Sequence, residues 1–333
     1  MQIHRDKVDY PKLEYSTQVL IQAALARDIV VDILDRKASI IRLTQGKKVE
    51  WIKQATRTSR DTHVVAHILD DKNLTKKLLR ENGLGVPAGE AYDTVSAYHF
   101  ARARFGDRKA VIEPNAFSGG RGIAFLPADS SIGAWQLAFQ RVLNDVNSLL
   151  VEAFVPGDDY RFLVIGYQTV AVVRRIPAYV VGDGFHTIQE LVAQKNADPR
   201  RGENADTPLC PLPLDETSQE QLQRQQANEA TVLPAGRVIY LRTTANISSG
   251  GDSVDVTDDV EKGYCRIAEN AAQALGAQVT GVDMLLTEAT QPPAESNYSV
   301  IELNANPALA IHAAPYAGQP RPVAAALLDF LGF

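Results

Sequence analysis

Two strand-like segments close to the C-terminus carry the side chains with the clearest chemistry. Residues two apart on a strand point to one face, so Glu302 and Asn304 share a face. Ile301 and Leu303 then point to the opposite face. Asp283 interrupts an otherwise apolar segment, and a buried carboxylate is costly unless a positive charge meets it. Carboxylate and amide oxygens are the ligands that Mg²⁺ prefers, so these residues predict a magnesium site. The alternative is that Asp283 caps a turn and Glu302 pairs with an arginine.

A glycine-rich segment, FSGGRG at residues 117–122, lies between two expected strands. Glycines let backbone N–H groups approach an anion closely, which makes the segment a candidate anion-binding loop. It is neither a P-loop nor a dinucleotide fingerprint, because no Gly-Lys-Ser/Thr follows and it does not open a helix. The alternative is a plain hairpin turn.

Two acidic residues flank a Pro-Gly turn at the end of another expected strand. Backbone groups beside Glu152 could hold a base, and the Asp159 carboxylate could accept hydrogen bonds from ribose hydroxyls. A hinge between two domains, with both acids in solvent, explains the pattern equally well.

Three arginines and one amide lie in or just after strands of the same region. Arg242 and Asn246 lead directly into the glycine turn ISSGGDS, which favours a role at an oxyanion or a phosphate. Arg161 and Arg174 complete the set, and the alternative is that all of them are scattered surface residues.

The elements that must position these residues begin with a small α/β unit over residues 1–83. Ser16 and Thr17 can cap a helix through residues 19–27, and an apolar strand follows it. Two alternating runs joined near Gly46 indicate a hairpin. Two short helices over residues 62–69 and 72–82 complete the unit, with Asp71 as a cap and Gly83 as a left-handed terminator.

Two further units follow along the chain. Residues 84–155 predict a helix and two strands around the glycine-rich segment, then a second helix and strand. Residues 156–333 carry several strands and a few helices, which favours an antiparallel sheet covered on one side. Residues 198–216 are polar and proline-rich, so we expect a surface loop there. The fold class is therefore α+β.

The composition is that of an ordinary globular protein. The 333 residues suit about two domains, and 34 basic against 40 acidic residues leave a net charge of −6. This balance argues against a protein that coats nucleic acid or an anionic membrane. Two cysteines provide no disulfide framework, and the first ten residues are too polar for a signal peptide. We expect a soluble, cytoplasmic protein.

Taken together, these motifs resemble the ATP-grasp enzymes, which clamp ATP between two α+β units and ligate a carboxylate to an amine. The resemblance is close to one branch, the ATP-grasp portion of bifunctional glutamate–cysteine ligase/glutathione synthetase and its relative cyanophycin synthetase. It is carried by DDKNLTKKLLRENGLGVP, VEAFVPGDDYRFLVIG, YLRTTANISSGGDSVDVTDD and IELNANPALAIHAAPYAGQPRPV, among other segments, and spans nearly the whole chain. The resemblance implies an ATP-grasp fold preceded by the small α/β unit. The ligase half of the bifunctional enzyme has no counterpart, so we expect a unit that stands alone.

The resemblance also implies cofactors and roles for individual residues. The cofactors are ATP and two Mg²⁺ ions, which Mn²⁺ could replace, and Glu302 would bridge the two ions bound by Asp283, Glu302 and Asn304. Arg242 and Asn246, with Arg174, would steady an acyl phosphate. The residues expected to contact the nucleotide are Lys72, Ser118, Gly119, Gly120, Gly122, Glu152, Val155, Asp159 and Arg161.

The activity implied is formation of a peptide bond through an acyl phosphate, as in glutathione synthetase, from γ-glutamylcysteine and glycine. The partners implied are small carboxylate and amine substrates, with no nucleic acid and no membrane, and we expect a homodimer. A stand-alone amino-acid or peptide ligase, or a non-catalytic nucleotide-binding module, are the alternatives.

One residue departs from the family pattern. The family has Val-Lys-Pro where this chain has Ile112, Glu113 and Pro114, so a carboxylate stands where a lysine normally contacts the nucleotide. Either Lys109 or Arg121 compensates for this change, or the binding of the nucleotide is altered or weakened.

Overall fold

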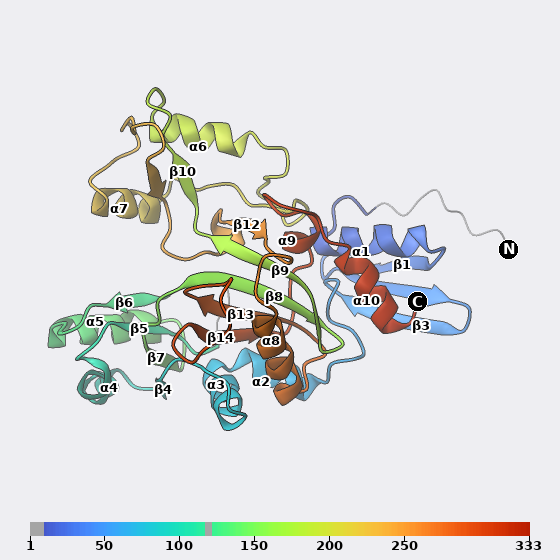
Figure 1. The fold of residues 1–333 in the computed structure, drawn as a ribbon, viewed down its shortest axis with the longest axis horizontal. Helices are drawn as coiled ribbons and strands as arrows, with labels where there is room; N and C mark the ends of the chain where they lie inside the picture. Colours follow the sequence, from blue (N-terminus) through green and yellow to red (C-terminus); the bar gives the residue numbers. More distant parts are fainter. Residues whose placement is uncertain (1–9, 117–121) are drawn as a thin grey trace. The chain divides into compact units, whose positions relative to one another are not determined.

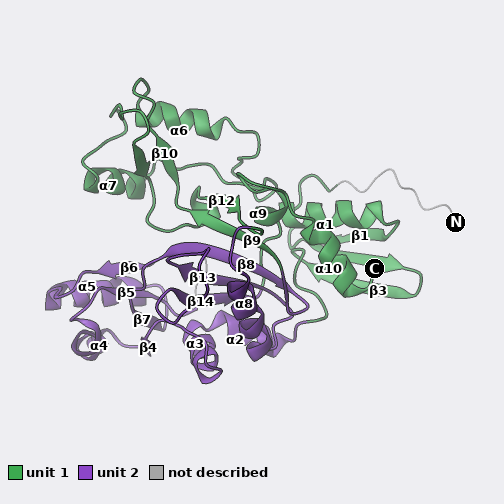
Figure 2. Cartoon of the chain, in the orientation of Figure 1, with its two compact units in different colours: residues 1–60, 170–258, 306–333 green, residues 61–169, 259–305 purple. Residues whose placement is uncertain are grey.

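The computed structural model describes residues 10–116 and 122–333, and the chain divides into two compact units (Figure 2). Both units combine helices with antiparallel strands, so the predicted α+β class is confirmed. The predicted division at residues 83 and 155 follows the chain in order and stays a prediction. Each compact unit is instead assembled from segments that are far apart in the sequence. Unit 1 consists of residues 1–60, 170–258 and 306–333, and unit 2 consists of residues 61–169 and 259–305.

A helix and a three-stranded antiparallel sheet form the N-terminal part of unit 1, as the apolar pattern predicts. Glu14 caps the helix, because its carboxylate accepts hydrogen bonds from the backbone N–H groups of Ser16 and Thr17. The prediction that Ser16 or Thr17 is the cap is therefore wrong, and both are buried in the first turn. Gly46, with φ of 60°, lies in the predicted hairpin turn. The elements are α1 (Tyr15–Ala26), β1 (Val30–Asp35), β2 (Ile40–Gln45) and β3 (Lys48–Lys53), shown in Figure 1.

The C-terminal helix α10 (Val323–Leu331) packs against α1 and was not among the expected elements. Both helices bury apolar side chains, including Leu20 and Leu327. At the rim of this contact, Arg27 and Asp329 form an ion pair of 2.6 Å. The last residues of the chain thus complete the packing of the first helix.

A helical module is built on a two-stranded ribbon in the middle of unit 1. The core of this module includes Ile188, Leu222 and Ile239, which are all buried. The second of its two helices was not predicted. The elements are β10 (Tyr179–Val181), α6 (Ile188–Asn196), α7 (Glu216–Arg224) and β11 (Val238–Tyr240).

The segment of residues 198–216, which the sequence predicts to be a surface loop, is partly internal. Arg201 and Leu209 are buried, and the Arg201 guanidinium pairs with the buried carboxylate of Asp252. The expectation of a surface loop over residues 198–216 is therefore wrong for its central part, because a buried acid provides a partner for the arginine. The elements are β9 (Gln168–Ile176), which pairs with β12 (Asp252–Asp255), the short helix η2 (Ile247–Ser249) and α9 (Ala310–Ala313).

Unit 2 begins with a four-stranded antiparallel sheet in the order β4-β7-β5-β6. Its core is centred on Trp135 and Phe139, which are fully buried. The expected helices and strands of residues 84–155 are present, with β4 in addition. The elements are β4 (Gly89–Tyr92), η1 (Val95–Ala97), α4 (Tyr98–Phe105), β5 (Ala110–Pro114), β6 (Ala124–Leu126), α5 (Ile132–Leu143) and β7 (Leu149–Ala153).

Three further antiparallel strands of unit 2, with β13 between β8 and β14, belong to a different sheet. Helix α3 begins after Asp71, whose carboxylate accepts from the Leu74 backbone N–H, and Gly83 follows it with φ of 74°, as predicted. This helix contacts α8, β14 and β4 (Figure 1). The elements are α2 (His63–Asp70), α3 (Lys72–Glu81), β8 (Asp158–Ile165), α8 (Lys262–Leu275), β13 (Val279–Leu286) and β14 (Tyr298–Asn304).

A helix needs about 20 consecutive, mostly apolar residues to cross a bilayer. Over residues 10–116 and 122–333, no helix combines the length and the apolar character that crossing a membrane demands.

Candidate functional site

Three charged residues form a row across the neighbouring strands β8, β13 and β14 of unit 2. The strand register places Asp283 directly opposite Arg161 on one side and opposite Glu302 on the other. The Arg161 guanidinium donates two hydrogen bonds to the Asp283 carboxylate, and both side chains are buried. The arginine that meets a buried acid is thus Arg161, and the acid is Asp283 rather than Glu302.

The three predicted metal ligands lie close together at the end of β14. The Asn304 side-chain nitrogen is 3.3 Å from Glu302 Oε1 and 3.5 Å from Asp283 Oδ2, which confirms that Glu302 and Asn304 share a face. The strict alternation fails at Ile301, because β14 bulges there and this residue has no partner on β13. Among the described residues, no three His, Cys, Asp or Glu side chains are grouped as a metal site. The predicted set has two carboxylates and one amide, and its oxygen-rich character fits Mg²⁺.

Two lysines of α3 point toward this row and toward the four-stranded sheet. Lys72 and Lys76 are one helical turn apart, and both side chains are buried. The Lys72 ammonium contacts the Glu113 carboxylate and lies 3.7 Å from Glu302. The Lys76 ammonium pairs with Glu152 and lies 3.9 Å from Glu113. These contacts link the metal-ligand candidates to the four-stranded sheet.

Glu113 and Glu152 lie on one face of the four-stranded sheet. Glu152 of β7 is paired with Val111 of β5, so Glu113, two residues further along β5, shares its face. Gly89 of β4 is the other neighbour of Glu152, and a Cβ there would lie 2.8 Å from the Glu152 side chain. A glycine is therefore needed at position 89 to leave room for the glutamate.

The pKa values show which charges are balanced and which are not. Burial by itself would lower the pKa of Lys72, but the charges of Glu113 and Glu302 raise it above its ordinary value. Burial raises the pKa of the Glu302 carboxyl, and repulsion from Asp283 adds to the rise. Burial also raises the pKa of Glu152, which the attraction of Lys76 opposes. Both glutamates are thus held in surroundings that would favour an additional positive charge.

The charged residues that these contacts link carry one negative charge in excess. We call this set the charged network of unit 2. It contains more carboxylates than cations, and the Oε1 atom of Glu152 is buried without a hydrogen-bond partner among the described residues. Its members are Arg161, Asp283, Glu302, Lys72, Glu113, Lys76 and Glu152.

The position of Glu113 tests one of the two compensating residues that the sequence suggested. Lys109 does not compensate for this carboxylate, because it is exposed and its ammonium lies 3.5 Å from the centre of the Phe154 ring. Lys72 and Lys76 are the partners of Glu113 instead. Arg121 lies outside the described residues.

The other predicted nucleotide contacts also belong to unit 2 where the structure describes them. Asp159 is half-buried on β8, two residues before Arg161, and half-buried Val155 follows β7. Gly122 has φ of 73°, which a residue with a side chain rarely adopts. Ser118, Gly119 and Gly120 lie outside the described residues.

The residues expected at the acyl phosphate all belong to unit 1. Arg242 donates hydrogen bonds to the Asp215 carboxylate and to the Ser218 hydroxyl at the start of α7, at 2.5 and 2.6 Å. Asn246 precedes η2, and its backbone oxygen accepts from the N–H of Gly251. Arg174 lies on β9 opposite Val254. The structure thus separates the expected site residues by unit, with metal and nucleotide candidates in unit 2.

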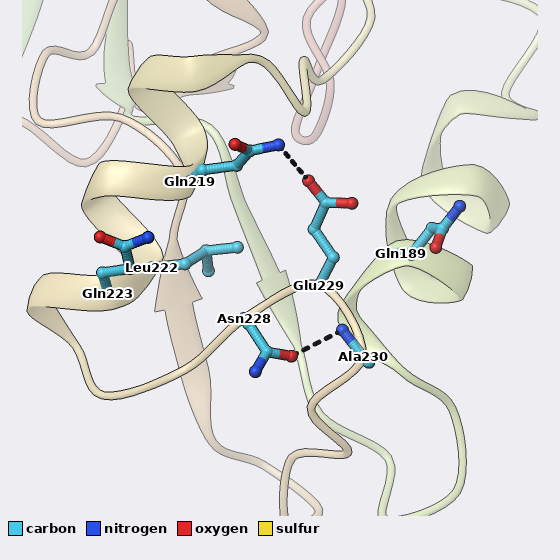
Figure 3. Close-up of a pocket in the computed structure, with 7 residues that line it drawn as sticks. All are labelled: Gln189, Gln219, Leu222, Gln223, Asn228, Glu229 and Ala230. Atoms are coloured by element: carbon cyan, nitrogen blue, oxygen red, sulfur yellow. Dashed lines mark hydrogen bonds between the residues drawn. The ribbon is translucent and has the colours of Figure 1, made fainter.

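A pocket of about 390 Å³ lies between α6 and α7 in unit 1 (Figure 3). Amide side chains dominate its lining, and Gln219 donates a hydrogen bond to Glu229 across it. None of the predicted site residues that the structure describes lines this pocket.

Sequence reasoning missed Lys76, although a signal for it is present. Lys72 and Lys76 have the i, i+4 spacing that places both side chains on one face of the predicted helix. The sequence shows the shared face but not the strand that the face meets.

A model of an ATP-grasp-like domain matches residues 12–64. The chain is 41% identical over 324 residues to the glutathione biosynthesis bifunctional protein of Clostridium perfringens, a match that covers 97% of the chain and 42% of that protein. It is 38% identical over 321 residues to the protein of that description from Desulfotalea psychrophila, covering 96% of the chain and 41% of the relative.

The crystal structure of a bifunctional glutathione synthetase from Pasteurella multocida has a similar fold. Its TM-score is 0.75 and its identity 33%, and the match covers 97% of this chain and 44% of that chain. The chain therefore spans about two fifths of the length of the curated relatives that it matches.

Proposed function

Because the chain is an ATP-grasp protein by fold and by sequence, as its motifs predict, we propose that it is an ATP-dependent carboxylate–amine ligase that forms a peptide bond. The observation that carries the proposal is the charged network of unit 2. It connects residues expected at the metal with residues expected at the nucleotide, and the connected set has an excess negative charge.

Asp283, Glu302 and Asn304 are the residues that would hold magnesium, as two ions or with manganese in its place. The metal would supply positive charge to phosphate oxygens. The raised pKa of Glu302 supports this assignment, because a cation near Glu302 and Asp283 relieves the repulsion between them. Lys72 and Arg161 would neutralise the phosphates, and the glycine-rich segment of residues 118–122 would contact them.

Adenine and ribose would be held at the other end of the network. The backbone from Glu152 to Val155 would contact the base, and the Asp159 carboxylate would accept from the ribose hydroxyls. The Glu152 Oε1 atom supports this role. It is a buried acceptor with no partner in the part of the chain that the structure describes, and such an acceptor fits a ligand that donates a hydrogen bond.

The reaction needs no side-chain nucleophile. A substrate carboxylate attacks the γ-phosphorus of ATP, which gives an acyl phosphate and ADP. An amine then attacks the acyl carbon, phosphate leaves, and the amine loses a proton to form the amide. Arg242, Asn246 and Arg174 would stabilise the negative charge of the acyl phosphate and of its tetrahedral successor.

We propose γ-glutamylcysteine and glycine as the substrates, because the relatives matched over nearly the whole chain are named for glutathione biosynthesis. A homodimer and a cytoplasmic location belong to the same proposal. The full activity of the longer relatives is not assigned to this chain, which spans about two fifths of their length.

The test is a product analysis with purified protein, Mg²⁺ and ATP. We expect glutathione by mass spectrometry, with ADP and phosphate formed in equal amounts and only when both substrates are present. An array of γ-glutamyl dipeptides and amino acids is the comparison. Turnover of a different pair, without glutathione, would contradict the substrates but keep the ligase. ADP release that needs neither a carboxylate nor an amine would contradict the ligase.

A further inference from the structure

Glu113 is the central member of a series of alternating charges. The series runs from Glu302 through Lys72 to Glu113, and from there through Lys76 to Glu152. The side chain of Glu113 is only 8% exposed, so both of its lysine contacts are shielded from water. Glu113 is the one carboxylate of this series that lies within 4.0 Å of both ammonium groups.

The two lysines require this carboxylate for a physical reason. They are one helical turn apart on α3, where like charges repel each other. Burial strengthens that repulsion, because the surroundings screen charge less than water does. Glu302 contacts only Lys72 in this series, and Glu152 pairs only with Lys76. Removal of the Glu113 charge would therefore leave two buried ammonium groups that repel each other across the middle of the site.

We propose that Glu113 is a positioning residue, which fixes the ammonium groups of Lys72 and Lys76 and, through them, the carboxylates of Glu302 and Glu152. This inference rests on the proposed function, in which Glu302 belongs to the metal end and Glu152 to the base end. Glu113 itself does not contact the nucleotide. A carboxylate at this position therefore supports nucleotide binding and does not repel the phosphates.

The test measures the affinity for a nucleotide directly. Isothermal titration of the full chain with the non-hydrolysable analogue adenylyl imidodiphosphate and Mg²⁺ compares wild type with Glu113→Gln, which keeps the shape and removes the charge. We expect binding to weaken about ten- to a hundredfold, which is about 1.4 to 2.8 kcal/mol. Glu90→Gln is the matched control, because Glu90 lies on the same sheet in an exposed pair with Arg104. We expect the control to bind within about twofold of wild type.

A second variant keeps the test decisive if Glu113→Gln does not fold. Glu113→Asp retains the charge but is one methylene shorter, so it cannot hold both lysines in the same places. We expect its affinity to fall about threefold to tenfold, between wild type and Glu113→Gln. A role limited to stability would lower the unfolding midpoint of the variants and leave their affinities unchanged.

The outcomes separate this inference from the proposed function. If wild type binds the analogue and every folded Glu113 variant binds equally well, the positioning role is overturned and the proposed function stands. If wild type does not bind the analogue, both are overturned. Weaker binding by the Glu113 variants, with an unchanged control, supports the positioning role.

Discussion

A charged cluster in each unit is unbalanced, and the two clusters are unbalanced in opposite directions. In unit 2, the charged network has more carboxylates than cations, and the pKa values of Glu152 and Glu302 are raised. In unit 1, the single carboxylate of Asp252 lies between two cations, Lys195 and Arg201. An added cation would stabilise the charged network of unit 2, whereas the cluster of unit 1 depends on the carboxylate of Asp252.

The cluster of unit 1 is closed by contacts within the protein. The Arg201 and Asp252 side chains are fully buried, and Arg201 also donates to the backbone oxygen of Cys210. The Lys195 ammonium lies 3.8 Å from the centre of the Tyr179 ring. This cluster therefore ties the segment around Arg201 to β12. The difference between the units suggests that a buried acid can be essential to stability in one unit and costly in the other.

The largest expected effect is that of removing the acid of unit 1. Asp252→Asn leaves Lys195 and Arg201 without a balancing charge, and we expect a loss of about 3 to 5 kcal/mol in the free energy of unfolding. Urea denaturation measures it. Asp258→Asn is the control, because Asp258 is an exposed partner of Arg321 in the same unit. A loss no greater than that of the control would mean that Asp252 does not hold the cluster together.

Removing an acid from unit 2 should have a different result. Glu302→Gln relieves the repulsion with Asp283, so we expect the metal-free protein to unfold within about 1 kcal/mol of wild type, or to be more stable. Ligation should nevertheless be abolished, because the metal would lose a charged ligand. Denaturation in EDTA and an ADP-release assay measure the two effects. A large loss of stability would show that the two units do not differ, and full turnover would remove Glu302 from the metal site.

The pH dependence of stability also tests this comparison, although the expected change in the free energy of unfolding is small. Folding raises the pKa of Glu302 above its ordinary value of 4.5. At pH values just above 4.5, the folded protein therefore still holds a proton that the unfolded chain has lost. The stability of the metal-free protein therefore falls as the pH rises through this window. Urea midpoints of wild type and Glu302→Gln, compared at about pH 5 and about pH 7.5, should show the variant gaining relative to wild type at the higher pH. A constant difference would contradict the raised pKa.

The smallest effect is expected for an exposed pair. Arg42 and Asp32 face each other across β1 and β2, at 2.8 Å, and their side chains are 43% and 44% exposed. Asp32→Asn should cost at most about 1 kcal/mol, and less in high salt, because water screens the pair. A loss comparable to that of Asp252→Asn would mean that burial is not what separates the strong pairs from the weak ones.

Much of the local structure could be predicted from residue patterns. The hairpin at Gly46, the cap at Asp71 and the shared face of Glu302 and Asn304 depend on neighbours within a few residues, and all three are confirmed. The predicted caps Ser16 and Thr17 are wrong because Glu14, a less common capping residue, already accepts their N–H groups. Helices α7 and α10 were not predicted.

The sequence by itself therefore determined most of the elements and the fold class, and it predicted the candidate metal ligands, because period and capping are local properties. Only the tertiary structure decided the partners of the buried charges. Lys72 and Glu113 are 41 residues apart, and Arg161 and Asp283 are 122 apart. Their pairing depends on which face of α3 meets β5 and on how β8 and β13 are aligned. The sequence shows which residues share a face of a helix or strand and which residues carry a charge. The energy of a buried charge, however, depends on the opposite charge that packing places beside it.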